Sequence, residues 1–546
     1  MPKRTITIED LWKLRNFQPN DSQRDAILYT DGPLFLTAGP GSGKTRVLLW
    51  RTLNLLVFHE VKPEDIFLST FTEKAALQLK DGLRTLLGVV TNETGQPFDI
   101  SKMALGTVHS ICQSIITDRR FSEGGARKHP PLLMDALSQY FKLYNRRYWT
   151  QLCVAGGFAD ENTANLEING YFGNSSAQFG PSQSRHSAVS EIIALFNRFS
   201  EESLNPDDCQ ASDATLTKML RMYRAYLNDL NSHPQIKQVD FSLLQKLAHD
   251  QITCLEEAAS VFKHVIIDEY QDTNAIQEKI FFNLAKGNKN ICVVGDDDQA
   301  LYRFRGATVE NLVEFEERCL NAIGVKPKRI DLDINYRSRK SIVDTYTGFI
   351  NIADWKKDKP LIGHYRIHDK NTKAHSTDTQ PSVVVSSHTR ADNVYRELAE
   401  FVYQLKLNGK IEDYSQCAFL FPAMKNNVRV EGFRQAFEEV NEGFRLKGTP
   451  NELKIYAPRA GRFLEVDEAR AIWGLMLLIF ERPHYGDTQN QSLRQFRQWM
   501  FDCIGFANQL CNEDPLLKQY VVDRKADLAL IAKDYEILLK LVSKAK

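Results

Sequence analysis

The sequence predicts an α/β fold built around a parallel β-sheet, and two observations support that prediction. Five apolar runs recur between segments of helical character, at residues 33–38, 64–70, 262–268, 290–296 and 329–334. Continuous apolar runs of this length are typical of strands that are buried on both faces of a parallel sheet. The first run also leads directly into a glycine-rich loop and a helical segment, as strands of such sheets do.

The regions between and after these runs predict helices and loops. Amphipathic segments between residues 110 and 240 indicate a helical insertion, and a Gly-, Asn- and Ser-rich stretch near 155–188 predicts a long loop within it. A second polar stretch at 368–382 divides the segment after residue 330. Beyond residue 465 the chain has mostly helical character.

Length, charge and cysteine usage bound the class of protein. A chain of 546 residues is longer than one hydrophobic core usually supports, which predicts about three or four domains or subdomains. Because 69 basic residues balance 69 acidic ones, any nucleic-acid site must be a local groove. The nine scattered cysteines contain no CxxC pair, which argues against a zinc site, an iron-sulfur cluster or a disulfide framework. With no signal peptide and no membrane-spanning run, we expect a cytoplasmic protein without a membrane partner.

The loop after the first predicted strand, AGPGSGKT at 38–45, has the features of a phosphate loop. Its glycines let consecutive backbone N–H groups surround phosphate oxygens at the start of a helix. Lys44 can reach the β- and γ-phosphates, and Thr45 can ligate Mg²⁺. Ala38 stands where the strict motif has glycine, and the alternative is a glycine-rich turn with an incidental Lys-Thr pair.

A second carboxylate strand is required beside a phosphate loop, and the run at 262–268 supplies it. Asp268 at the strand end would hold Mg²⁺, and Glu269 would act as base or orient the attacking water. Without the phosphate loop, an Asp-Glu pair after a strand is more often a solvated strand end. A further stretch, VVGDDDQALYRFRGA at 293–307, places three carboxylates beside an alternation of arginines and aromatic residues.

Ordered motifs along the chain resemble those of the UvrD/Rep/PcrA-type superfamily 1 DNA helicases. They are NDSQ (20–23), STFTEKAA (69–76), GTVH (106–109), DEYQDT (268–273), GDDDQALYRFRGA (295–307), NYRS (335–338) and, in diverged form, APRAGRFLEVDEAR (457–470). Tyr270 replaces the usual Phe of the family, and Phe304 replaces its usual Trp. The resemblance covers roughly residues 17–470.

The resemblance implies a nucleotide site for ATP and Mg²⁺. Gln23 would read adenine, Gln299 would sense the γ-phosphate and Arg337 would act as an arginine finger. The candidate catalytic residues are Lys44, Glu269, Gln299 and Arg337, and the candidate metal ligands are Thr45 and Asp268. The candidate nucleotide-binding residues are Gln23, Gly39, Pro40, Gly41, Ser42, Gly43, Lys44, Thr45 and Arg46.

The resemblance also implies a track for single-stranded DNA. Its candidate residues are Thr70, Phe71, His109, Tyr302, Phe304 and Arg305. Aromatic faces stack on any base, so binding should tolerate sequence and depend strongly on salt. Alternatively, Phe71 and Tyr302 are core residues, and Lys74 and Arg305 are solvated charges or ion-pair partners of the acidic triplet Asp296–Asp298.

The family architecture implies four regions. These are a first RecA-like ATPase domain at 1–110 and 240–325, a helical insertion at 111–239, a partial second RecA-like domain at 326–464 and the start of a helical inserted subdomain at 465–546. The last two family motifs are not found, and we interpret Thr389-Arg390-Ala391 as a chance match. We therefore expect the N-terminal part of a longer polypeptide. The alternative is a natural variant with a reduced second motor domain.

The expected function is that of an ATP-dependent 3′–5′ single-strand DNA translocase or helicase, acting in repair, recombination or defence. It would bind single-stranded DNA or duplex with a single-stranded tail, and a nuclease or repair protein as partner. The alternative is an ATP-switched DNA-binding subunit without unwinding activity, which partners a nuclease in antiphage defence. A degenerate scaffold that does not use ATP is disfavoured by Lys44, Asp268, Glu269 and Gln299.

Overall fold

The computed structural model describes most of the chain in two compact units, Met1–Val383 and Val384–Lys546. The described residues are 6–125, 129–176, 180–209, 211, 213–232, 237–303, 306–353, 366–367, 370–387, 390–421, 428–446, 453, 455, 466–480 and 491–528. None of the helices in this described part is both long and apolar enough to span a membrane.

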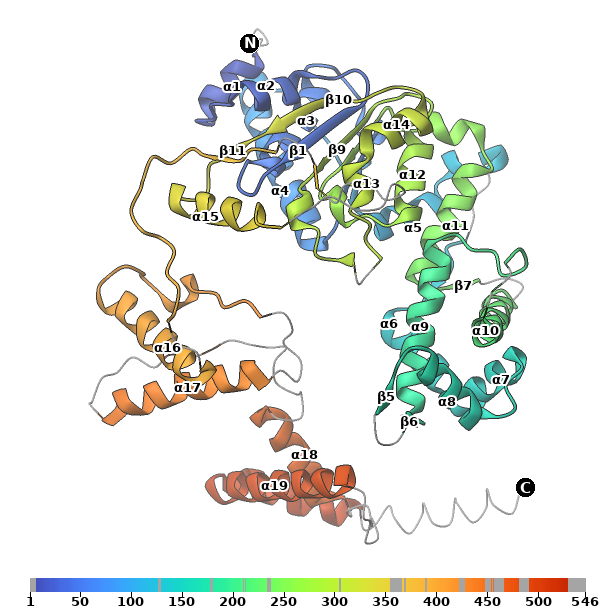
Figure 1. Cartoon of the computed structure of the whole chain (residues 1–546), viewed down its shortest axis with the longest axis vertical. Coiled ribbons are helices and arrows are strands. Elements are labelled where there is room, and N and C mark those ends of the chain that lie inside the picture. The colour runs from blue at the N-terminus through green and yellow to red at the C-terminus, as the bar shows by residue number, and fades with distance from the viewer. Residues whose placement is uncertain are drawn as a thin grey trace. The chain divides into compact units, whose positions relative to one another are not determined.

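The first unit is built on a six-stranded sheet in which every neighbouring pair of strands is parallel (Figure 1). In spatial order the strands are β10 (Lys328–Leu332), β1 (Leu34–Ala38), β9 (Ile291–Gly295), β8 (His264–Ile267), β2 (Ile66–Thr70) and β3 (Ala104–Thr107). The predicted α/β fold with a parallel sheet is confirmed, and each of the five apolar runs overlaps a strand of the sheet. β3 lies outside those runs because its four residues, ALGT, carry little apolar signal.

Successive residues of a strand point to opposite faces of the sheet, and helices cover both of these faces. Leu34 and Leu36 of β1 pack in one core with α1 (Ile8–Leu14), α2 (Asp21–Leu28), α3 (Lys44–Val57) and α4 (Glu73–Thr94). Phe35 of the same strand packs in a second core with α5 (Val108–Thr117), α11 (Phe241–Thr253), α12 (Ala275–Ala285) and α14 (Phe315–Ile323). The sheet and its two helix layers form a three-layer structure. Because the six strands are parallel, the loops that follow them meet at one edge of the sheet.

A helical insertion separates α5 from α11. It contains α6 (Ala136–Tyr144), α7 (Arg146–Gly156), α8 (Glu161–Tyr171), α9 (Arg185–Glu201) and α10 (Ala214–Leu230). Two-residue strands accompany these helices: β4 (Leu132–Leu133) pairs with β7 (Gln238–Val239), and β5 (Ser175–Ser176) pairs with β6 (Gly180–Pro181).

The long loop predicted near 155–188 is wrong in part, because α8 lies inside it. Asp160 caps this helix by accepting a hydrogen bond from the Thr163 N–H at 2.8 Å. Asn165 is buried and accepts from the Trp149 indole N–H at 3.0 Å. Polar asparagines are buried against the core of the insertion. This burial explains why a segment with the composition of a loop forms a helix.

Two predicted domain boundaries differ from the structure. The boundary at 110 falls inside α5, which follows β3 without a break. The boundary at 325 leaves β10 outside the first ATPase domain, although β10 pairs with β1 along its full length. An apolar run does not specify which sheet the strand will join, which explains the second difference.

After β10 the first unit continues through α15 (Lys340–Ile350), and β11 (Ile334–Asn335) pairs in parallel with β12 (Lys373–Ala374). The short helix α13 (Glu310–Val313) lies between β9 and α14 in the chain. Because β11 and β12 are hydrogen-bonded, the segment after β10 and the segment near residue 373 form one local structure.

The second unit includes α16 (Ala391–Leu407), α17 (Val428–Leu446), α18 (Asp467–Ile479) and α19 (Gln491–Glu513). α16 and α17 share a core around Tyr403, Phe433 and Phe437. α18 packs closely on α19, so that a Cβ at Gly474 would collide with the Cys503 carbonyl. No strand is present in the described part of this unit, and a second RecA-like sheet stays a prediction.

Candidate functional site

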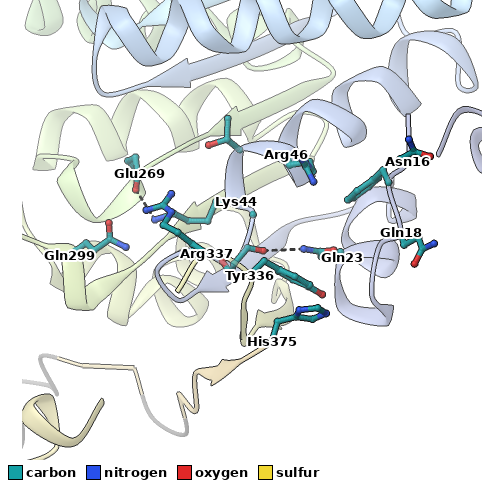
Figure 2. Close-up of a pocket in the computed structure, with 15 residues that line it drawn as sticks. Asn16, Gln18, Gln23, Lys44, Arg46, Glu269, Gln299, Tyr336, Arg337 and His375 are labelled. Carbon is teal, nitrogen blue, oxygen red and sulfur yellow. Dashed lines mark hydrogen bonds and ion pairs between the residues drawn. The ribbon is translucent and has the colours of Figure 1, made fainter. Parts of the chain in front are cut away.

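A cavity of about 820 Å³ opens at the carboxyl edge of the sheet (Figure 2). Its lining comes from the 41–46 loop after β1, Glu269 after β8, Gln299 after β9, and Tyr336 and Arg337 after β11. The loops after β1, β8 and β9 meet at the same edge because these strands are parallel in one sheet. The four candidate catalytic residues, Lys44, Glu269, Gln299 and Arg337, all line this one cavity.

The loop between β1 and α3 requires glycine at two positions. Gly41 and Gly43 have φ values of 68° and 86°, which other L-residues rarely adopt. A Cβ at Gly41 would also lie 2.7 Å from Asn335 Oδ1 and 2.8 Å from the Arg337 Cβ. The Ser42 hydroxyl in the same loop is buried and has no hydrogen-bond partner among the described residues. The loop therefore presents unsatisfied polar groups to the cavity.

Gln23 holds this loop in place. Its Nε2 donates to the Ser42 carbonyl at 3.0 Å, and its Oε1 accepts from the Asn20 N–H at 3.3 Å. Asn20 in turn caps α2 by accepting from the Gln23 N–H at 2.8 Å. Both polar ends of the Gln23 amide thus have protein partners, and its role in reading adenine stays a prediction.

Planar side chains form the outer wall of the cavity. The Arg46 guanidinium lies 5.5 Å from the centre of the Phe17 ring, and the Tyr336 ring lies 4.8 Å from that of His375. Such surfaces suit a flat aromatic base. Tyr336 and His375 were not among the candidate residues: the NYRS motif could have indicated Tyr336, whereas no sequence signal marks His375.

A chain of hydrogen bonds crosses the floor of the cavity. Lys44 Nζ lies 3.0 Å from Glu269 Oε2, which also accepts from Gln271 Nε2 at 2.9 Å. Gln271 Oε1 accepts from the Asp296 N–H at 3.1 Å. Glu269 has φ 52° and ψ 48°, a left-handed conformation that costs a residue other than glycine about 1–2 kcal/mol. Strain of this kind is concentrated at functional sites.

The carboxylates after β8 form a cluster that is short of positive charge. Asp268 is 5% exposed, and burial together with the Glu269 charge raises its pKa to about 7, against the opposing effect of Lys44. Burial and Glu269 likewise raise the pKa of Asp272 to about 7. Asp272 Oδ1 is buried without a hydrogen-bond partner among the described residues. Asp272 was missed as a candidate, although it lies within the DEYQDT motif.

Gln299 and Arg337 approach the cavity from two other loops. Gln299 Nε2 donates to Asp296 Oδ2, and the Asp296 carboxylate is completely buried. The Arg337 N–H donates to Asn335 Oδ1 at 2.8 Å, and the Arg337 side chain lines the same cavity as Lys44 (Figure 2). The cavity thus combines the cations of Lys44, Arg46 and Arg337 with the Gln299 amide and the Glu269 carboxylate.

Phe71 and Tyr302 are the two described aromatic candidates that lie together. Their ring centres are 4.8 Å apart, and Phe71 is 36% exposed. Thr70, by contrast, is 1% exposed, because β2 lies between β8 and β3 and is buried along its length. The whole residue is covered in this structure, and a DNA contact at Thr70 stays a prediction.

The remaining candidate residues for DNA binding are His109, Phe304 and Arg305. His109 Nε2 lies 2.9 Å from Gln245 Nε2, and its ring meets the edge of Phe241 at 5.4 Å. Burial lowers the pKa of His109, so the neutral ring can accept a hydrogen bond from the amide. Phe304 and Arg305 lie outside the described residues.

Comparisons with known proteins show which family the chain belongs to. Residues 19–319 match the family model described as the UvrD/REP helicase N-terminal domain. The ATP-dependent DNA helicase SRS2 of Saccharomyces cerevisiae is 30% identical over 361 residues, which are 62% of this chain and 27% of SRS2. The ATP-dependent DNA helicase PcrA of Staphylococcus epidermidis is 30% identical over 345 residues, 63% of this chain and 41% of PcrA.

The PcrA helicase of Staphylococcus aureus is 27% identical over 433 residues, 79% of this chain and 50% of that protein. The chain thus spans half or less of the length of these curated relatives. The family model, however, matches more than half of this chain in one continuous region, which contains β1, β2, β3, β8 and β9. The chain belongs to the UvrD/REP helicase family.

Proposed function

We propose that this chain contains the ATP-hydrolysing part of a motor that moves 3′ to 5′ along single-stranded DNA, as a translocase or helicase in repair, recombination or defence. The observation that carries the proposal is the convergence of Lys44, Glu269, Gln299 and Arg337 on one cavity. The names of the relatives, which are ATP-dependent DNA helicases, support the same activity. The polarity follows from the family resemblance alone.

The residues of the cavity fit ATP with Mg²⁺. The unpartnered Ser42 hydroxyl and the backbone of the glycine loop at the start of α3 suit phosphate oxygens. The raised pKa of Asp268 and of Asp272 marks carboxylates that a divalent cation would stabilise in ionised form. Asp268 and Thr45 would hold the ion. Bound Mg²⁺ supplies charge neutralisation on the phosphates.

Each catalytic residue then has a role that its position allows. Lys44 would leave Glu269 for the β- and γ-phosphates. Glu269 would keep its hydrogen bond to Gln271 and orient the attacking water. Arg337 would neutralise charge that develops on the γ-phosphoryl group, an effect worth about 10³ to 10⁵ in kcat for arginine fingers.

The aromatic pair Phe71–Tyr302 is the described feature that suits single-stranded DNA. Base stacking on such rings contributes about 1–3 kcal/mol per base. Tyr302 belongs to the same loop as Gln299, and Phe71 directly follows β2. A shift of Gln299 on a γ-phosphate would therefore move one member of the pair, which suggests how nucleotide and DNA are coupled.

ATP hydrolysis by the full chain, with and without single-stranded DNA, tests the proposal. We expect hydrolysis that DNA stimulates and that Lys44→Ala reduces to background. Lys263→Ala is the matched control, because its ammonium pairs with Asp65 at 2.8 Å just before β8 begins, at the opposite edge of the sheet. Equal rates for the wild type and Lys44→Ala would reject the proposal.

Strand displacement separates the motor from an ATP-switched DNA-binding subunit that partners a nuclease. Unwinding of a duplex with a 3′ tail, but not of one with a 5′ tail, supports the helicase and its polarity. ATP-dependent DNA affinity with DNA-stimulated hydrolysis, but without displacement or movement along the strand, supports the switch.

A further inference from the structure

The acidic triplet Asp296–Asp298 is paired with two cations from a segment that carries no helicase motif. Lys370 Nζ pairs with all three carboxylates, at 2.8 Å from Asp297 Oδ1 and 2.9 Å from Asp298 Oδ2. Arg366 donates to both oxygens of Asp298, from Nε at 2.8 Å and from Nη2 at 3.2 Å. The Ile367 N–H donates to Asp297 Oδ2 at 2.9 Å.

This ion cluster is buried, and its two cations balance most of the charge of the three carboxylates. The side chains of Lys370 and Asp296 are 6% and 0% exposed. Burial alone would lower the pKa of Lys370, but the three carboxylates outweigh it and keep the pKa above its ordinary value. The ammonium therefore stays charged, and it occupies the centre of carboxylates whose oxygens lie within 4.8 Å of one another.

The cluster is connected to the cavity through a single carboxylate. Asp296 accepts from Lys370 on Oδ1 and from Gln299 Nε2 on Oδ2. Its N–H donates to Gln271, which also binds Glu269. An ammonium on one oxygen restricts rotation of the carboxylate, and this orientation sets where the Gln299 amide points.

We propose that Lys370 is a positioning residue of the nucleotide site, which fixes the Asp296 carboxylate so that Gln299 is held ready for the γ-phosphate. The proposal rests on the proposed function, because it assigns Gln299 a part in ATP hydrolysis. It extends that function to a residue outside every motif.

The connection has a mechanical consequence for the arginine finger. β12 follows Lys370 closely in the chain and pairs with β11, in the register Asn335 to Ala374. Arg337 lies two residues after β11 and Lys370 three residues before β12, so the same two-stranded sheet connects the two side chains. Movement of this sheet would act on Gln299 through Lys370 and on the γ-phosphate through Arg337 at the same time.

The experiment compares three variants of the full chain. Lys370→Met removes the ammonium. Lys370→Met combined with Asp297→Asn removes one charge of each sign, while the amide oxygen introduced by the second substitution can still accept from the Ile367 N–H. Lys373→Met is the matched control, since this lysine of the same segment is 64% exposed and only 3.6 Å from its partner Asp333. The measurements are kcat and KM for ATP, thermal unfolding, and amide hydrogen exchange of residues 294–303 without nucleotide.

We expect the double variant to unfold near the wild-type temperature and its kcat to fall about ten- to a hundred-fold, as when a hydrogen-bonding partner behind a functional side chain is lost. KM should change much less, and exchange at 294–303 should become faster. Lys373→Met should match the wild type in all measurements.

A folded double variant with wild-type kcat and wild-type exchange would overturn the proposal, because Lys370 would then act only in charge balance. A loss in Lys373→Met equal to that in Lys370→Met would also overturn it. If the wild type does not hydrolyse ATP, the proposed function fails, and the exchange measurement still decides this inference: faster exchange in the double variant supports it, and unchanged exchange overturns it.

Discussion

Two acidic clusters lie at the ends of the neighbouring strands β8 and β9, and they differ in how their charge is balanced. Asp268, Glu269 and Asp272 follow β8, and Lys44 is their cation. The triplet Asp296–Asp298 follows β9 and is paired with both Lys370 and Arg366. The first cluster holds carboxylates whose pKa is raised to about 7. In the second, two cations face three carboxylates, so the chain itself balances most of the negative charge.

Acid density alone therefore does not identify a metal site. Three consecutive aspartates look more suited to a cation than the dispersed acids of DEYQDT. Buried carboxylates, however, need a nearby positive charge, and the chain itself supplies that charge to the triplet. Under the proposed function, Mg²⁺ and a nucleotide would complete the cluster after β8.

The largest expected difference between the two clusters is in kcat, when one carboxylate of each cluster is replaced by an amide. Asp268→Asn should lower kcat for ATP by about 10³-fold, because a metal contributes several kcal/mol to charge stabilisation during phosphoryl transfer. Asp298→Asn should lower it less than about ten-fold, since Lys370 still pairs with the other two aspartates. Hydrolysis measured over a range of Mg²⁺ concentrations checks both, and equal losses would contradict the comparison.

The sequence predicts much of this arrangement because several of its signals are local. Strand-like runs predict the sheet, and the phosphate loop needs only its own glycines and the helix that follows. The ordered motifs indicate the family, and the parallel sheet explains why Lys44, Glu269 and Gln299 meet. The pairing of β10 with β1 has no local signal in the sequence. The residue pattern of the edge strand of one sheet resembles that of the first strand of another sheet.

The partners of the acidic triplet could not be predicted for the same reason. Lys370 lies 74 residues from Asp296, in a polar stretch that carries no motif. Sequence reasoning considered Lys74 and Arg305 as partners; Lys74 is exposed, and Arg305 lies outside the described residues. The motif likewise does not predict the burial of Thr70, because this burial depends on the strands on both sides of β2.

The pH dependence of stability offers the next contrast. Without Mg²⁺ the pKa of Asp268 is about 7 in the folded chain, against 3.8 ordinarily. Between these pH values the folded state binds more protons than the unfolded state, so the free energy of unfolding falls as pH rises from about 4 to 7. The loss should be roughly 2–4 kcal/mol.

Urea unfolding at pH 5 and pH 8 measures this loss. Asp268→Asn should remove the part of the slope that Asp268 causes, while Asp272, whose pKa is also raised to about 7, keeps the rest. Saturating Mg²⁺ should reduce the slope by stabilising the ionised carboxylates. Asp298→Asn should leave the slope as in the wild type. A slope in Asp268→Asn equal to that of the wild type would mean that Asp268 does not cause it and that this carboxylate is not short of positive charge.

The smallest expected effect concerns the backbone strain that only the first cluster contains. Asparagine adopts the left-handed conformation of Glu269 more readily than glutamate, and Glu269→Asn also removes a carboxylate beside Asp268. These gains exceed the loss of the part-exposed pair with Lys44, which is worth at most about 1 kcal/mol. Glu269→Asn should therefore unfold at higher urea, with a gain of about 1 kcal/mol, and should no longer hydrolyse ATP.

Glu60→Asn provides the control, because Glu60 has φ 48° at an exposed position away from the cavity. It should gain comparable stability and keep full activity. If Glu269→Asn were instead destabilised while Glu60→Asn was stabilised, the ion pair with Lys44 would outweigh both strain and repulsion. The cluster after β8 would then be complete without a ligand, and its contrast with the triplet would disappear.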